Sequence, residues 1–411
     1  MKRFTLATAT AVALLAAGTA SASAATRAVD DDGMATPRNC NATTAASPTI
    51  QGAVNVSSAG DTIVVCPGTY NEQVRVPADK DRLTLISSSR RQAIIKAPPA
   101  YTNGTVDLVR VDGAENVSFA SFTITGPQPD TAYCNPLLVS NVRIGGGGSA
   151  NLVDNRITQA KPSNPALRGC QNGFGVQIGR NAESDTGTGR LYYNEIDDYN
   201  KGGVYVDNVG SKLIAVGNTV RGPDLSGGAL GVALAAANGV QISRGADADF
   251  ERNRVLDNVF PGVRAVADGP FIDGLEPGQS SGIILFDNVD SDITLRNNYV
   301  DNNDNNLGLF NSDGGEFKNN TLLDAVFYDG IYADEDSSGN RFISNTALGN
   351  EEHDCHDDST GRGTAGTANV WNGNRGETSQ PEGLCRKNKR GGKHHDDDDR
   401  HHDDDDKHDD D

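Results

Sequence analysis

The chain has 411 residues and a formal net charge of −20, with 56 Asp and Glu against 36 Lys and Arg. This acidic balance argues against a protein that follows nucleic-acid phosphates, so no nucleic-acid partner is expected. The 47 Gly, the single Trp and the two Met argue against a helical bundle, and recurring apolar segments argue against disorder throughout.

Residues 1–24 form a predicted signal peptide. Two basic residues precede a short apolar stretch, and small residues follow up to Ala22-Ser23-Ala24. This order is typical of secretory signals, so we expect a protein secreted to the cell envelope or the extracellular space. Residues 25–46 are then an N-terminal leader. The apolar stretch is too short to cross a bilayer, and no other candidate follows, so no membrane span is expected.

Six cysteines follow the predicted signal. In an exported protein an even number of cysteines indicates disulfides, although the sequence alone leaves several connectivities open. We favour pairing between sequence neighbours, which gives Cys40–Cys66, Cys134–Cys170 and Cys355–Cys385. None lies in a C-x-x-C motif, which argues against a zinc site made of cysteines.

A short capping helix is predicted before the first strand. Ser47 is a suitable N-cap, and Pro48 suits the first helical position. One apolar face at helical spacing is formed by Ile50, Ala53 and Val54. Such a helix would cover the first open end of a repeat structure.

The middle of the chain is a repeat. A Gly starts an alternating apolar segment at Gly175, Gly203, Gly239, Gly282, Gly308 and Gly330. An Asn-x-apolar triplet recurs at Asn155, Asn194, Asn218, Asn253, Asn298, Asn320 and Asn345. The shortest intervals between these Asn are 22–25 residues, which indicates a period in the low twenties.

This period, with short β-branched segments and Gly and Asn turns, predicts an all-β fold, a right-handed parallel β-helix over 47–350. It would have about 12–13 coils. Stacked Asn amides are expected to form a ladder, and the Gly to supply backbone angles that a Cβ forbids. A propeller or a leucine-rich repeat disagrees with the period and composition; a β-sandwich remains the alternative.

Three insertions of about ten residues precede Gly-started segments, at 156–174, 219–238 and 263–281. Loops inserted at the same point of each coil project from one side and predict a ligand groove. The turns after the Gly-started segments supply candidate groove residues, Arg180, Asp207, Arg244, Asp313 and Asp334. The alternative is a purely structural role of these side chains in turns.

Asp287, Asp290 and Asp292 lie within six residues, and we consider them a candidate Ca²⁺ site. An ion there would neutralise a carboxylate of a bound ligand and assist abstraction of a neighbouring proton. A cation nearby would help, and Arg264 and Arg296 are the candidate catalytic residues. The alternative is again that the carboxylates only serve the turn.

Residues 351–386 are predicted to form a C-terminal cap closed by a disulfide. A candidate metal-binding group there consists of His353, Asp354, His356, Asp357 and Asp358. Residues 387–411 begin basic and end with 11 Asp and five His, so we expect a disordered tail. The tail is either solubilising or a binder of divalent metal. All seven His lie at 353, 356 or in the tail, so no His is expected to act in the solenoid.

A resemblance rests on the opening segment and the coils that follow it. The segment reads Ile50-Gln51…Ala53-Val54…Gly60-Asp61-Thr62-Ile63…Pro67-Gly68-Thr69-Tyr70-Asn71-Glu72. With the Asn-x-apolar coils it resembles secreted parallel β-helix proteins of the pectin-lyase-like superfamily, over roughly 47–350. The resemblance implies a polysaccharide bound along one sheet. The paired Asp motifs and the Gly-His-Gly of related hydrolases are not evident, so catalysis is left open.

The sequence therefore favours a secreted β-helix protein that binds an extended polysaccharide along one sheet. A calcium-dependent lyase acting on a uronic-acid polysaccharide is one alternative, with Ca²⁺ as its cofactor. An exported metal-binding protein that acts through its tail is the other. The pattern gives no indication of the oligomeric state.

Overall fold

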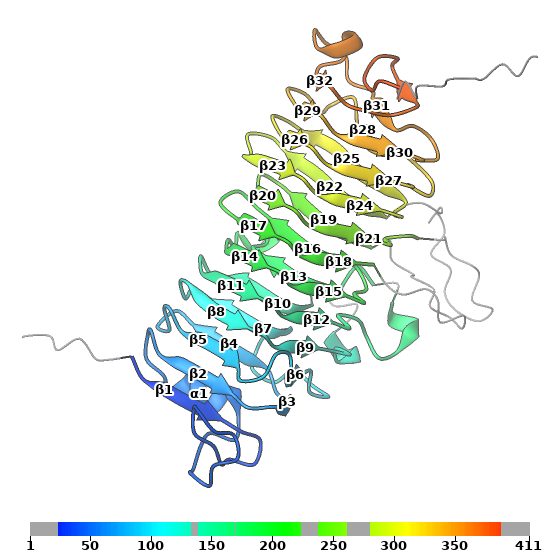
Figure 1. Ribbon diagram of the computed structural model, residues 1–411. Coiled ribbons are helices and arrows are strands. Elements are labelled where there is room, and N and C mark those ends of the chain that lie inside the picture. Colours follow the sequence, from blue (N-terminus) through cyan, green and yellow to red (C-terminus); the bar gives the residue numbers. More distant parts are fainter. Residues whose placement is uncertain (1–23, 133–138, 169, 223–236, 261–279, 388–411) are drawn as a thin grey trace, which may run out of the picture.

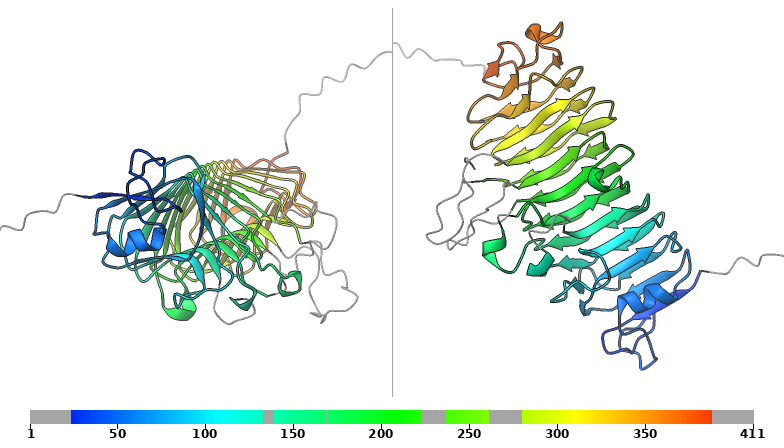
Figure 2. Two further views of the ribbon diagram at one scale, coloured as in Figure 1. Left: turned by 90° about the horizontal axis from the view of Figure 1, so that it is seen from below. Right: turned by 180° about the vertical axis from the view of Figure 1, so that it is seen from behind.

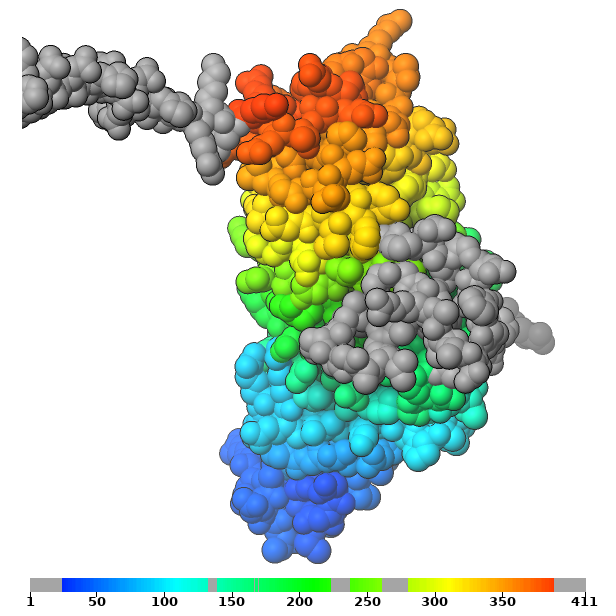
Figure 3. Space-filling model, turned by 90° about the vertical axis from the view of Figure 1, so that its right-hand side faces the viewer, coloured from blue at the N-terminus to red at the C-terminus, as the bar shows by residue number. Residues whose placement is uncertain are grey.

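The protein is a parallel β-helix in which one coil stacks on the next (Figure 1). The structure is a computed structural model and describes residues 24–132, 139–168, 170–222, 237–260 and 280–387. The stack is elongated, with the N-terminal coils at one end and the C-terminal coils at the other (Figure 3). No helix among the described residues is long and apolar enough to cross a membrane.

Three parallel sheets run along the stack and enclose one interior (Figure 2). The 12 strands of sheet I are β1 (Thr26–Val29), β2 (Thr62–Val65), β5 (Thr84–Ser87), β8 (Val117–Ala120), β11 (Ser149–Val153), β14 (Thr188–Tyr192), β17 (Lys212–Val216), β20 (Asp247–Glu251), β23 (Ile293–Arg296), β26 (Glu316–Lys318), β29 (Arg341–Ile343) and β32 (Val370–Asn372).

The 11 strands of sheet II are β4 (Val74–Pro77), β7 (Asp107–Asp112), β10 (Ser140–Gly145), β13 (Phe174–Ile178), β16 (Gly202–Asp207), β19 (Asn238–Ser243), β22 (Ser281–Asn288), β25 (Asn305–Ser312), β28 (Ile331–Ala333), β31 (Cys355–Asp357) and β33 (Ser379–Gln380). The Gly-started segments of the sequence all fall in or next to this sheet.

The 10 strands of sheet III are β3 (Gly68–Asn71), β6 (Ala93–Lys96), β9 (Thr123–Thr125), β12 (Arg156–Thr158), β15 (Glu195–Asp197), β18 (Thr219–Arg221), β21 (Arg254–Leu256), β24 (Tyr299–Asp301), β27 (Thr321–Leu323) and β30 (Thr346–Leu348). The helical elements are α1 (Ile50–Val56), η1 (Asp130–Ala132), η2 (Pro165–Leu167), η3 (Asn181–Glu183) and η4 (Thr364–Gly366). The predicted parallel β-helix is confirmed, and β1 adds a first strand from within the segment predicted as a leader.

The predicted Asn ladder is confirmed at the corner between sheets I and III. Asn194 donates to Asn218 Oδ1 from its backbone N–H (2.8 Å) and from Nδ2 (2.9 Å). Nδ2 also donates to the carbonyl of Leu152 in the preceding coil (2.8 Å). Equivalent bonds link the buried residues Asn155, Asn194, Asn218, Asn253, Asn298, Asn320, Asn345 and Asn374. The amides therefore tie each coil to both of its neighbours.

The Gly-started segments require glycine for a different reason from the one predicted. None of the six Gly has a positive φ, so unusual backbone angles do not explain them. A Cβ on Gly203 would instead lie 2.4 Å from Val220 Cγ1 and 2.7 Å from the carbonyl oxygen of Gly239. Glycine is needed there because the backbone of sheet II approaches the core and the next coil too closely for a side chain. Gly308 differs, since it lies on the outer face, where a Cβ would be 2.7 Å from Asn305 Nδ2 and 2.8 Å from the Phe310 ring.

The N-terminal cap is helix α1, and its predicted apolar face of Ile50, Ala53 and Val54 is buried. The predicted N-cap is wrong: Thr49, not Ser47, accepts the hydrogen bond from Gly52 N (3.1 Å). The carboxylate of Glu72 accepts from the first two backbone N–H groups of the helix, at 2.8 and 2.9 Å. Glu72, the last residue of the segment that carries the family resemblance, thus connects the capping helix to the first coil.

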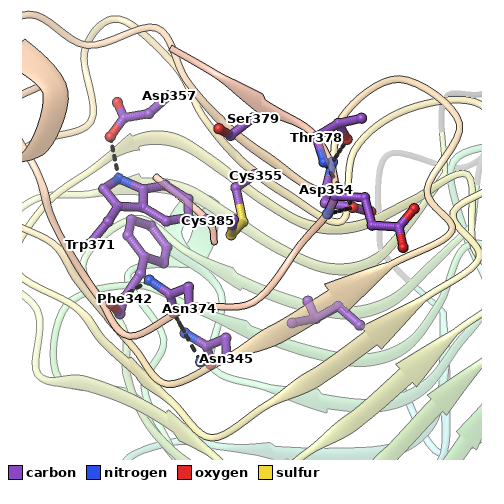
Figure 4. The surroundings of a disulfide bond; sticks show 12 residues. Phe342, Asn345, Asp354, Cys355, Asp357, Trp371, Asn374, Thr378, Ser379 and Cys385 are labelled. Carbon is purple, nitrogen blue, oxygen red and sulfur yellow. Dashed lines mark hydrogen bonds between the residues drawn. A yellow bond between two sulfur atoms is a disulfide. The ribbon is translucent and has the colours of Figure 1, made fainter. Parts of the chain in front are cut away.

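The C-terminal cap closes the other end (Figure 4). Trp371 stacks on Phe342, with ring centroids 4.0 Å apart, and its Nε1 donates to Asp357 (2.7 Å). The predicted disulfides Cys40–Cys66 and Cys355–Cys385 are both present. Cys170 is also disulfide-bonded, but its predicted partner Cys134 lies outside the described residues.

Removing one amide from the ladder should destabilise the whole stack. Asn218→Ala leaves buried donors and acceptors of two neighbouring coils without partners, which should cost about 3 kcal/mol of unfolding free energy. Chemical denaturation measures this loss. The matched control Asn71→Ala changes an exposed Asn of β3 and should stay within about 0.5 kcal/mol of the parent. Equal effects of both substitutions would contradict a structural ladder.

Candidate functional site: a groove on the outer face of sheet II

One row of side chains follows the outer face of sheet II from end to end. These residues alternate with core residues and are aligned by strand register. The row consists of Arg75, Arg110, Arg143, Gln177, Tyr205, Gln241, Ile284, Gly308, Tyr332, His356 and Gln380. It changes along the stack from cationic to aromatic and polar, which distinguishes the two halves of the sheet.

The first half of the row is closed by ion pairs. Arg143 is only 2% exposed and pairs with Glu183 and Asp185, both at 2.6 Å. Arg110 pairs with the buried carboxylate of Asp107 at 3.2 Å. Burial raises the pKa of Asp107, while the Arg143 and Arg110 guanidinium groups oppose that rise. These charges already have protein partners, so this half offers little for a ligand.

The second half is open and forms a groove of about 460 Å³. It crosses β22, β25, β28 and β31 and the turns that lead into them. Its lining residues are Ser281, Ile284, Asn305, Phe310, Tyr328, Asp329, Tyr332, Glu352, His356 and Asp358. The groove combines aromatic rings with carboxylates and an imidazole, a composition that suits recognition of a polar ligand with apolar faces.

Aromatic rings form one wall of this groove. The Phe310 and Tyr332 centroids are 5.6 Å apart, and the His356 ring lies edge-on to Tyr332 at 5.1 Å. The hydroxyl of Tyr332 donates to Asp358 Oδ2 (3.2 Å). Burial raises the pKa of Tyr332, and the neighbouring carboxylates raise it further, so this hydroxyl stays protonated at neutral pH. The wall therefore offers apolar ring surface beside a fixed donor.

His356 lies between two carboxylates. Its Nδ1 is 3.2 Å from Asp329 Oδ2 and its Nε2 is 3.0 Å from Asp358 Oδ1. Burial alone would lower the pKa of His356, but hydrogen bonds and charge from Asp329 and Asp358 raise it above its usual value. His353 Nδ1 also approaches Asp329, at 3.3 Å from Oδ1. The groove thus brings titratable groups of two successive coils together.

The assumption behind the expectation that no His acts in the solenoid, namely that His353 and His356 lie apart from its sheets, is corrected for His356 by the strand pairing. β31 pairs in parallel with β28, and His356 aligns with Tyr332 on the outer face of sheet II. The cap is a continuation of the coils, so its residues share their sheets. The first carboxylate of the site, Asp329, was missed because it lies one coil earlier. A period in the low twenties could have indicated it, since Asp329 precedes His353 by 24 residues.

The predicted groove residues lie at turns and have partners within the protein. Asp207 pairs with Arg244 (3.0 Å) and accepts from the backbone of Asn181 (2.8 Å). Asp313 accepts from Ser338 N (2.7 Å), and Asp334 accepts from Ser337 Oγ (2.7 Å). Arg180 pairs with Glu183 (2.5 Å). These contacts support the structural alternative at turns, and ligand contact by these residues stays a prediction.

The predicted calcium residues are exposed and do not converge. Asp287, Asp290 and Asp292 are absent from the described groups whose ligand atoms lie within 4.8 Å of one another. Arg296 lies on sheet I, where it pairs with Glu251 (3.0 Å) and Asp249 (3.3 Å). Arg264 lies outside the described residues, as do the tail residues 388–411. The calcium site, the catalytic arginines and metal binding by the tail stay predictions.

The segments predicted as insertions connect sheet III to sheet II. Segments 156–174 and 219–238 begin with β12 and β18, segment 263–281 lies between β21 and β22, and each ends at a strand of sheet II. Residues 223–236 and 261–279, which make up much of two insertions, lie outside the described residues. A further long connection, from β9 to β10, was missed. A second hollow lies at this corner, but its charges pair with each other, as Arg156 with Asp197 (3.1 Å) and Lys161 with Asp198 (2.5 Å).

Comparison with known proteins gives similarity of fold only. No protein-family model and no curated protein matches the chain. Among solved structures, the catalytic unit of a GH87 α-1,3-glucanase from Streptomyces thermodiastaticus has 12% identity and a TM-score of 0.44, over 80% of this chain and 66% of that one. The chain thus spans slightly less than two thirds of that glucanase unit.

Two further β-helix structures are similarly distant. The A-module of the Azotobacter vinelandii mannuronan C-5 epimerase AlgE4 has 14% identity and a TM-score of 0.42, over 80% of this chain and 94% of the module. Pectate lyase Pel9A has 11% identity and a TM-score of 0.40, over 86% of this chain and 78% of the lyase. At these identities the likeness is limited to the fold.

The C-terminal disulfide should hold the groove in place, because Cys355 immediately precedes His356. Replacing Cys355 and Cys385 by Ser should lower the unfolding free energy by about 3–4 kcal/mol. Hydrogen exchange of backbone amides in β31 should also become faster. The matched control replaces Cys40 and Cys66, which close a loop of similar length at the other end. It should lose similar stability with unchanged exchange in β31; faster exchange there in both variants would contradict a local role.

Proposed function

We propose that the protein is exported and binds an extended polysaccharide along the outer face of sheet II. The observation that carries this proposal is the groove across β22, β25, β28 and β31, which combines aromatic rings with hydrogen-bonding side chains. Strands of one sheet are about 4.8 Å apart, so a groove across four of them suits several consecutive residues of an extended chain.

The chemistry of the lining fits a sugar ring. A pyranose presents C–H groups on its faces and hydroxyl groups around its edge. Phe310, Tyr328 and Tyr332 offer ring surfaces for the faces. Asp358, Glu352 and Asn305 offer acceptors, and in the amide also donors, for the hydroxyl groups.

The charge of the groove without a bound ion favours a neutral glycan. Three carboxylates line it, from Asp329, Glu352 and Asp358, against the single imidazole of His356. A uronic-acid chain would meet like charges at close range, which is unfavourable unless a cation lies between them. The uronate-directed lyase is therefore the weaker alternative for this groove.

Export is supported by the covalent structure. The Cys40–Cys66 disulfide cross-links the N-terminal end of the stack, and Cys355–Cys385 cross-links the C-terminal end. Structural disulfides persist in oxidising compartments. The basic residues and the apolar stretch within residues 1–24, which predict a signal peptide, also support export.

Removing the aromatic wall should abolish most of the glycan binding. Tyr332→Ala and Phe310→Ala each remove a ring from the groove and should weaken binding to neutral polysaccharides about tenfold or more. A glycan array that includes neutral glucans, polygalacturonate and alginate identifies the ligand, and titration measures the affinity.

The matched control is Tyr193→Ala, which removes an exposed ring (64%) outside the groove and should leave binding unchanged. Product analysis of the same mixtures tests for cleavage. Wild-type protein that retains no glycan of either class would contradict the proposal, and exclusive retention of uronic-acid chains would contradict the preference for neutral ones.

A further inference from the structure

We propose that Asp329, His353 and His356 form a binding site for a divalent transition-metal ion of the zinc type, at the edge of the groove. This site goes beyond glycan binding and does not depend on it. The three residues come from two successive coils, and one ligand atom of each lies within 4.8 Å of the others. Two imidazoles and one carboxylate are a common donor set for such ions.

The spacing of the donor atoms matches a metal site. Nδ1 of His353 is 3.3 Å from one oxygen of Asp329, and Nδ1 of His356 is 3.2 Å from the other. In a tetrahedral zinc site with bonds of 2.0–2.1 Å, two neighbouring donor atoms are about 3.3–3.4 Å apart. The two imidazoles contact different oxygens of Asp329, so one ion is bound either through both carboxylate oxygens or after a small rotation of the carboxylate.

The ring orientation of His356 suits coordination from Nδ1. Its Nδ1 faces Asp329 and its Nε2 faces Asp358. An imidazolium donates to both carboxylates, whereas a ring with only Nε2 protonated donates to Asp358 and directs the Nδ1 lone pair toward Asp329. An ion bound by Asp329 would accept that lone pair.

Asp358 orients the ring of His356 for this site. A metal-binding His commonly donates its other ring nitrogen to a carboxylate, which fixes the tautomer and the ring orientation. Asp358 Oδ1 accepts from His356 Nε2 at 3.0 Å, and its other oxygen, Oδ2, accepts from the Tyr332 hydroxyl at 3.2 Å. Asp358 is thus a positioning residue, and the groove side is open for a water or ligand as a further donor.

The metal-binding group predicted from the sequence contains both His, but its carboxylates are those of Asp354, Asp357 and Asp358 and not that of Asp329. Asp354 accepts from Asn350 Nδ2 (2.8 Å) and from the backbone of Glu377 (2.6 Å). Asp357 accepts from Trp371 Nε1 (2.7 Å). Both are used to hold the cap, and Asp329 of the preceding coil takes the place of the ligand.

The test is titration of the full chain with Co²⁺ and Zn²⁺. Co²⁺ bound by two imidazoles and a carboxylate gives visible absorption bands typical of low coordination, and Zn²⁺ should displace them. We expect these bands in the wild type and their loss in the variant His353→Ala/His356→Ala. Asp358→Asn should keep the bands but weaken Co²⁺ binding about tenfold or more.

The tail also contains His, so a matched control is needed. His401→Ala/His402→Ala changes two His outside the described residues and should keep the bands. The milder variant His353→Asn, with its melting temperature measured without metal, separates loss of the site from loss of the fold. Identical Co²⁺ spectra of the wild type and the His353/His356 variants, or absence of such bands in the wild type, would overturn the metal site and leave the glycan proposal untouched.

Discussion

Stacking of the coils in register is the constraint on which the rest of this structure depends. Each Asn of the ladder before the last, Asn374, bonds both to the next Asn and to a carbonyl of the preceding coil, as Asn194 does to Asn218 and Leu152. A coil displaced by one residue would leave these buried groups unpaired, and unpaired buried polar groups cost more than a hydrogen bond contributes. The same displacement would turn the core residues of three sheets outward. The ladder and the apolar rows therefore specify one register together.

Register converts a fixed distance in sequence into contact in space. Asp329 reaches His353 and His356 because 24 and 27 residues complete about one turn of the stack. Tyr332 aligns with His356 for the same reason. No single coil contains the groove, the metal ligands or the aromatic wall. Each arises only when neighbouring coils are stacked, and the disulfide and Trp371 in the last coil keep that stacking at the end of the molecule.

Much of the fold could be predicted because its determinants are local and periodic. The Asn triplets, the apolar face of α1 and the two described disulfides follow from spacing in the sequence. The N-cap was misplaced by two residues because Ser47, Pro48 and Thr49 are all acceptable near a helix start, and the choice depends on the strand that precedes them. The role of the Gly was misjudged because close approach by Val220 and Gly239 is a tertiary property. His356 was assigned to the cap alone because the cap was treated as separate from the solenoid, whereas backbone pairing continues into it.

The position of the groove follows from a difference in charge between the outer faces of the two halves of sheet II. In the first half, the guanidinium groups are held by Asp107, Glu183 and Asp185, which fill the outer face. In the second half the same row carries Ile284 and Gly308, which need no ionic partners. A Cβ on Gly308 would lie 2.8 Å from the ring of Phe310, so the missing side chain lets this ring lie against the sheet.

The neighbours of His356 complete this arrangement. Cys355 is fully buried in its disulfide, and Asp357 is held by Trp371. Because side chains alternate along a strand, two residues anchored inward direct the one between them outward, toward the groove. The cap is thus both the end of the solenoid and the support of its histidine.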